Sequence, residues 1–143
     1  MTIQQLSVFL ENRAGQLAEI TEILAEHGID LRAIHIAETT DYGVLRLITT
    51  APHEAASILL EKGCVLSMTP VMAAAVPDKP GGLAKLLAVV AQANIDIEYM
   101  YSMFGNGDGM AYMIFRVADL ERLASVLTAN GITPSTPEEL GTH

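Results

Sequence analysis

Cysteine, tryptophan and long apolar runs are nearly absent from this 143-residue sequence. The single cysteine, Cys64, cannot form an internal disulfide and is typical of a protein in a reducing cytoplasm. Lys85 interrupts the best candidate for a membrane span, residues 83–93, which also falls short of the ~18 residues that a span needs. Residues 1–5 lack the basic start of a signal peptide. We therefore expect a cytoplasmic protein with no membrane partner.

Basic residues are also scarce, since eight Lys and Arg face 17 Asp and Glu for a net charge of −9. The acidity is even: residues 1–69 carry nine acidic and four basic side chains, and residues 70–143 carry eight and four. A nucleic-acid partner requires a positive patch, so we expect none. The four histidines lack a metal-ligand spacing on one element. We accordingly expect no metal and no cofactor.

One short stretch, however, occurs twice, with the two copies 66 residues apart. Residues 12–18 read NRAGQLA, and residues 78–84 read DKPGGLA. The same offset aligns Ile29-Asp30 with Ile95-Asp96. A period of this length is too long for a solenoid unit and indicates a small domain duplicated in tandem.

Hydrophobic periodicity gives both halves the same order of elements. In the first half we expect strands at 3–11, 30–39, 44–50 and 64–68, and helices at 14–27 and 52–62. In the second we expect strands at 71–76, 95–104 and 110–117, helices at 80–93 and 118–129, and a strand stub at 132–133. Each half thus reads β-α-β-β-α-β, the ferredoxin-like arrangement. This predicts an α+β protein with two antiparallel sheets, each covered by helices on one face.

The halves are joined closely, because only Thr69-Pro70 separates their strands. We expect a first domain at 1–69, a second at 70–134, and a flexible tail at 135–143. A connection this short also predicts that the two domains pack as an internal pseudo-dimer.

The repeated turn is suited to a small anion. Gly15 and Gly81 allow a ligand to approach the backbone, and the first amides of the following helix have no intrahelical partners. Together with the helix dipole these amides favour a carboxylate. Asp30 can accept from an ammonium group, so turn and aspartate together match a free amino acid. In the alternative reading, Asn12 and Asp78 only cap helices, and the two strand aspartates only bond local backbone.

At these residues the sequence resembles the ACT domain, a small regulatory module that binds amino acids. The resemblance is carried by residues 10–17 and 26–30, recurs in the second half, and covers about residues 3–68 and 70–133. It implies an amino-acid site built from Asn12, Ala14, Gly15, Gln16, Leu17 and Asp30, and a second built from Asp78, Gly81, Gly82, Leu83 and Asp96. A polar residue that some members carry two places before the asparagine is here Leu10, with Val76 in the second half.

The resemblance further implies a non-catalytic protein that binds an amino acid at the seam between its ACT repeats, forms a homodimer and signals to a separate metabolic enzyme. A second hypothesis is an assembly module whose sites bind no ligand. The third is an acyl-phosphate hydrolase on the same fold. It would need an arginine in a phosphate-binding loop, for which Arg13 is the sole candidate, and the surrounding pattern does not fit.

Overall fold

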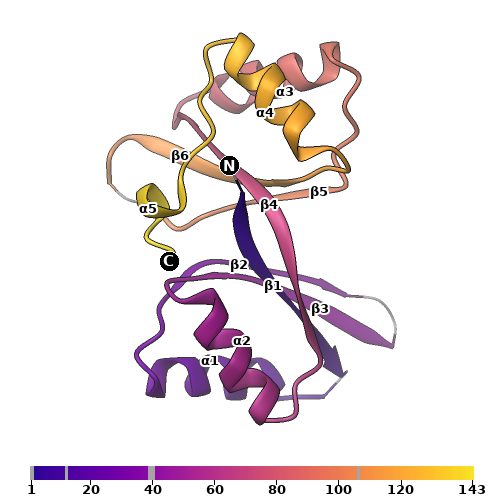
Figure 1. The fold of residues 1–143 in the computed structure, drawn as a ribbon, viewed down its shortest axis with the longest axis vertical. Helices are drawn as coiled ribbons and strands as arrows, with labels where there is room; N and C mark the ends of the chain where they lie inside the picture. Colours follow the sequence, from indigo (N-terminus) through magenta and orange to yellow (C-terminus); the bar gives the residue numbers. More distant parts are fainter. Residues whose placement is uncertain (1, 12, 39–40, 106) are drawn as a thin grey trace. The chain divides into compact units, whose positions relative to one another are not determined.

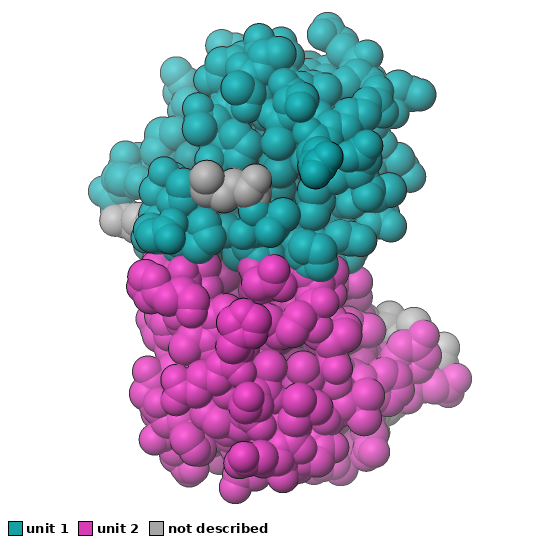
Figure 2. Space-filling view, in the orientation of Figure 1, with its two compact units in different colours: residues 1–3, 70–140 teal, residues 4–69, 141–143 magenta. Residues whose placement is uncertain are grey.

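The chain forms two compact units in the computed structural model, which describes residues 2–11, 13–38, 41–105 and 107–143. One unit comprises residues 4–69 and 141–143, and the other comprises residues 1–3 and 70–140 (Figure 2). We refer to them as the first-repeat unit and the second-repeat unit. Among the described residues there are six strands and five helices.

The first-repeat unit contains β1 (Ile3–Glu11), α1 (Gln16–Glu26), β2 (Leu31–Glu38), β3 (Tyr42–Thr49), α2 (Pro52–Glu61) and the start of β4 (Leu66–Pro77). Its strands are ordered β2-β3-β1-β4, and both helices cover one face of the sheet (Figure 1). Leu6 pairs with Leu47 across the antiparallel β1–β3 ladder. Because side chains alternate along a strand, these residues share the helix-covered face with Val8 and Leu45, and all four are fully buried.

The second-repeat unit contains the rest of β4, α3 (Gly82–Gln92), β5 (Tyr99–Ser102), β6 (Met110–Arg116), α4 (Leu120–Ala129) and α5 (Pro137–Leu140). Its strands are ordered β4-β6-β5, with α3 and α4 on the same face (Figure 1). Phe115, Leu123 and Leu127 are fully buried in its core. The α+β class and the tandem ferredoxin-like architecture predicted from the sequence are thereby confirmed.

Matching backbone signals end the first helix of each repeat. Gly28 has φ 69° after α1, and Asn94 has φ 56° after α3. In each case the amide of this residue and the next bond back to carbonyls in the last turn, as in Gly28 to Ala25 and Asn94 to Ala91. Glycine and asparagine tolerate this left-handed conformation better than other residues.

Three expected boundaries differ from the structure. The strands expected at 64–68 and 71–76 form one strand, β4, that continues through Thr69-Pro70. The strand expected at 95–104 is reduced to β5, because Ile95 and Ile97 pack against the core before the ladder with β6 begins at Tyr99. The stub expected at 132–133 is a single bridge between Ala74 and Pro134.

The segment expected to be a flexible tail, residues 135–143, forms hydrogen bonds and contains a buried leucine. The amide of Ser135 bonds to the carbonyl of Ala73 at 2.8 Å, and Leu140 is fully buried. Beyond α5, the amide of His143 bonds to the carbonyl of Thr50 at 2.9 Å. Residue 135 is thus bonded within the second-repeat unit, and residue 143 within the first-repeat unit. No helix among the described residues has the length and hydropathy to cross a membrane.

Candidate functional site

The repeated turn has nearly the same backbone in both copies. Gly15 has φ 86° and ψ −8°, and Gly81 has φ 86° and ψ −10°. Two residues before each glycine, a cation closes a tight turn: the amide of Arg13 bonds to the carbonyl of Glu11 at 2.8 Å, and that of Lys79 to the carbonyl of Pro77 at 2.9 Å. Each glycine is the N-cap of its helix and its carbonyl accepts the first intrahelical bond.

Among the described residues no side chain caps either helix. Asp78 is not the N-cap residue of α3 and forms no cap bond to that helix, so it does not have the capping role that the alternative reading assigned to it. Asn12, its counterpart, lies outside the described residues. The remaining predicted turn residues lie at the start of their helices, with Ala14 exposed, Gln16, Leu17 and Leu83 half-buried, and Gly82 buried.

The predicted strand aspartates lie at the other end of each first helix. Helix α1 has 11 residues, which separates Gly15 from the segment of Asp30 by about 16 Å at the usual rise per residue. Asp30 is exposed and forms a long ion pair with Arg32 at 3.9 Å. Asp96 lines a shallow hollow of about 110 Å³ with Arg122. One repeat alone thus does not bring its turn and its aspartate together.

The residue after each turn glycine distinguishes the two copies. Oε1 of Gln16 accepts a hydrogen bond from the amide of Glu11 at 2.8 Å. The second copy has Pro77 and Gly82 at these places. Proline has no amide to satisfy, and a Cβ at Gly82 would overlap the carbonyl oxygen of Pro77. The two substitutions compensate for each other, so the turn keeps its shape with different contacts.

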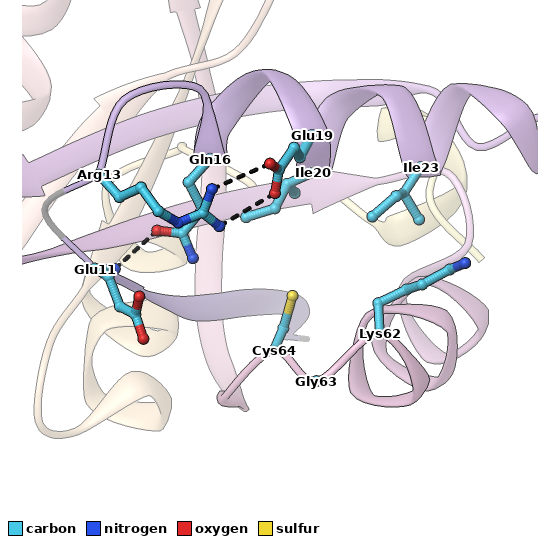
Figure 3. A pocket seen from close by; sticks show the side chains of 9 residues that line it. All are labelled: Glu11, Arg13, Gln16, Glu19, Ile20, Ile23, Lys62, Gly63 and Cys64. Carbon is cyan, nitrogen blue, oxygen red and sulfur yellow. Dashed lines mark hydrogen bonds and ion pairs between the residues drawn. The ribbon is translucent and has the colours of Figure 1, made fainter.

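A cavity of about 180 Å³ lies beside the first turn, between α1 and the loop that joins α2 to β4 (Figure 3). The guanidinium of Arg13 donates to both oxygens of Glu19, at 3.1 and 3.2 Å. This bidentate hydrogen bond, with the attraction of the arginine charge, lowers the pKa of Glu19 and raises the pKa of Arg13. The pair occupies the wall of the cavity, where both charges are already neutralised.

Cys64 also lines this cavity and packs against the core of the first-repeat unit, although the strand expected to start there begins at Leu66. It precedes β4 and is half-buried. Burial, followed by the negative charge of Glu19, raises the pKa of the thiol. The thiolate is therefore disfavoured, and nothing at Cys64 indicates a nucleophile.

An equivalent cavity of about 360 Å³ lies in the second-repeat unit. Its lining residues Gly82, Lys85, Leu86 and Val89 match Gln16, Glu19, Ile20 and Ile23 at the offset of 66, and Asn130 and Ile132 match Lys62 and Cys64 at an offset of 68. Neither cavity was anticipated, although both offsets are visible in the sequence. The repeat pattern could have shown that these positions lie together.

The sequence predicts no metal site. Among the described ranges no three His, Cys, Asp or Glu side chains are placed to hold a metal ion. His35 is half-buried on β2, and burial together with the charge of Arg46 lowers its pKa.

Comparison with known proteins identifies a family with the same duplicated domain. A family model described as an ACT domain pair matches residues 1–142. Protein BT0572 from Bacteroides thetaiotaomicron has a similar structure, with 36% identity, a TM-score of 0.91, and coverage of 100% of this chain and 98% of that one. A search of curated proteins finds no match.

Two regulatory subunits of aspartate kinase share the fold at lower identity. The ligand-free subunit from Thermus thermophilus has 18% identity and a TM-score of 0.62, with 88% of this chain and 90% of that chain covered. The subunit from Thermus flavus has 18% identity and a TM-score of 0.59, with 88% of each chain covered. With two matching repeats and a family match over nearly its whole length, the chain belongs to the ACT domain pair family.

Proposed function

We propose that this chain is a non-catalytic regulatory protein that binds a free amino acid and signals its concentration to a separate metabolic enzyme. The observation that carries the proposal is the doubled turn, in which Gly15 and Gly81 adopt the same left-handed conformation before an uncapped helix. Unpaired amides at such a helix start favour a carboxylate. ACT domains are regulatory modules, which agrees with this reading.

The ammonium group of the ligand would be held by Asp30 or Asp96. Since α1 separates Asp30 from the turn of its own repeat, we infer that the turn of one chain and the aspartate of a second copy supply the two halves of a site. A ligand bound this way stabilises one arrangement of the copies. By linkage it then favours one state of the regulated enzyme.

Calorimetric titration with individual amino acids tests the site. We expect saturable binding of one chemical group of amino acids, and at least tenfold weaker binding in the Asp30→Ala variant. Asp41→Ala is the matched control, because Asp41 is an exposed aspartate in the β2–β3 connection of the same unit. Equal affinity of wild type and Asp30→Ala for every amino acid would show that Asp30 is not part of the site.

A second candidate function is assembly without a ligand. Phe9 and Tyr42 stack at a centroid distance of 5.0 Å, and each side chain remains more than two-fifths exposed. Exposed stacked aromatics are typical of a contact surface. This alternative predicts a mass that rises with protein concentration in sedimentation, a loss of that rise in Phe9→Ser, and no response to any amino acid.

A further inference from the structure

The second-repeat turn carries two unpaired cations where the first carries an ion pair. Lys79 is equivalent to Arg13 and Lys85 is equivalent to Glu19, both at the offset of 66. Arg13 and Glu19 neutralise each other. Lys79 and Lys85 instead line one cleft of about 280 Å³. Among the described residues neither lysine side chain has a hydrogen-bond or ion-pair partner. A small anion would supply the negative charge that the second repeat lacks.

An apolar cavity adjoins this cationic cleft. Pro77, Gly82 and Lys85 line both the cleft and the cavity of about 360 Å³ beside it. The cavity wall includes Val76, Leu86, Val89 and Ile132, with no acidic side chain among its described lining residues. Its size is at the low end for ligand sites. A short aliphatic chain would fit there while its anionic end faced the two lysines.

Gly82 explains why this cavity is larger than its counterpart. In the first repeat the side chain of Gln16 occupies the equivalent place and bonds to the amide of Glu11. At Gly82 the space has no side chain, and the carbonyl of Pro77 approaches too closely for a Cβ. The second repeat is thus open and apolar at the position where the first is filled and polar.

The absence of a carboxylate decides the chemical class of the ligand. An ammonium group in this cavity would be desolvated next to the charge of Lys85, with Lys79 in the adjoining cleft. The neutral amide of Asn130 is the other polar side chain on the described wall, and its Nδ2 already donates to the carbonyl of Val126 at 2.8 Å. We propose that the second-repeat unit binds a short, branched aliphatic monocarboxylate without an amino group, such as a deaminated amino acid. The inference replaces the amino-acid proposal at the second turn alone: a monocarboxylate would bind there, while the first turn and Asp30 keep the amino-acid site.

Isothermal titration of the full chain with 4-methylpentanoate tests this assignment. We expect saturable binding, at least about tenfold stronger than that of leucine, which adds an ammonium group, or of the neutral 4-methylpentanamide. Acetate, which lacks the aliphatic tail, should bind at least about tenfold more weakly as well. If acetate or inorganic phosphate competes as well as 4-methylpentanoate, the lysines bind anions without a tail pocket and the proposal is wrong.

Variants locate the binding. Lys85→Glu should weaken binding about tenfold, whereas Lys62→Glu, which makes the same charge change at the first-repeat cavity, should leave it unchanged. Val89→Phe fills the apolar cavity and should abolish binding, with folding checked by circular dichroism. Affinity unchanged by Lys85→Glu and by a folded Val89→Phe would overturn the assignment. Failure here would leave amino-acid binding intact, because Asp30→Ala tests that site separately.

Discussion

Oε1 of Gln16 accepts a hydrogen bond from the amide of Glu11 at 2.8 Å, a contact that the second repeat replaces by removing both partners. Pro77 has no amide N–H and Gly82 has no side chain, so the same backbone turn has different contacts in the two repeats. The consequence is a polar, charge-neutralised cavity in one repeat and an apolar, cationic one in the other. The two repeats therefore share one fold but differ in the polarity and charge of their cavities.

The close approach at Gly82 makes it sensitive to any side chain. Gly82→Ala should lower the free energy of unfolding by about 1–3 kcal/mol, because the new Cβ overlaps the backbone carbonyl of Pro77. Urea denaturation measures the change. Gly105→Ala is the control, since nothing lies within 4 Å of its added Cβ, and it should alter stability by less than about 0.5 kcal/mol. Equal stability of the two variants would contradict the steric argument.

Backbone strain should appear at Gly15. Alanine at φ 86° costs about 1–2 kcal/mol, whereas Gly15→Asn should cost less because asparagine tolerates the left-handed region. The Gly81→Ala variant should lose as much as Gly15→Ala, since the two φ values agree. Thermal unfolding compares the variants. A stability of Gly15→Asn below that of Gly15→Ala would show that something other than backbone conformation governs this position.

The C-terminal segment should contribute to stability. Leu140→Ala should lower the free energy of unfolding by about 2–4 kcal/mol, because Leu140 is fully buried. Leu60→Ala is the matched control, since that leucine is 54% exposed and its loss should cost less than about 1 kcal/mol. Chemical denaturation monitored by circular dichroism measures both. Equal effects of the two substitutions on the free energy of unfolding would show that burial of Leu140 adds no stability, as expected if residues 135–143 were a flexible tail.

Asp108 should make stability depend on acid. The hydroxyl of Tyr112 donates to it at 2.6 Å and the amide of Met110 at 3.0 Å, and these bonds lower the pKa of the carboxyl. A carboxyl with a lowered folded-state pKa stabilises the fold above its ordinary pKa. This contribution is lost as pH falls from the ordinary value through the folded one.

Tyr112→Phe should therefore raise the pKa of Asp108 toward its ordinary value, which carbon NMR titration of the carboxyl resolves. Arg122 provides a control away from this pair: Arg122→Gln should leave the titration of Asp108 unchanged. An identical Asp108 titration in wild type and Tyr112→Phe would show that the tyrosine hydroxyl does not lower the pKa of Asp108.

The sequence predicted most of the fold because both repeats carry the same periodicity and helix stops. It missed the continuity of β4 because Thr69-Pro70 was interpreted as a break. Pro70 instead precedes Met72, where the pairing of β4 with β6 begins, so its missing amide lies outside that ladder. Its carbonyl accepts from Arg116 at 2.8 Å.

The C-terminal helix also had a sequence signal. Thr136 and Glu139 have the spacing of a capping box around Pro137. In the structure Oγ1 of Thr136 accepts from the amide of Glu139 at 3.1 Å. Pro137 begins α5, in agreement with the preference for proline in a first helical turn.

The candidate site was less predictable than the fold. The two turns before the first helices followed from the repeated sequence, but the separation of Gly15 from Asp30 depends on the direction and length of α1. Each cavity is lined by segments distant in the sequence, such as those of Glu19 and Cys64 in the first and of Lys85 and Ile132 in the second. Local sequence patterns do not encode such contacts unless the offsets of the repeat are followed to the end of each unit.

The most direct test of amino-acid sensing is a thermal-unfolding panel of the full chain against the twenty amino acids, one at a time. A ligand at about a hundred times its dissociation constant adds about 2.7 kcal/mol to the free energy of unfolding. For a chain of this size that raises the unfolding midpoint by several degrees. Our account predicts such a rise for one chemical group of amino acids. Flat traces across the whole panel would contradict it and favour the assembly module.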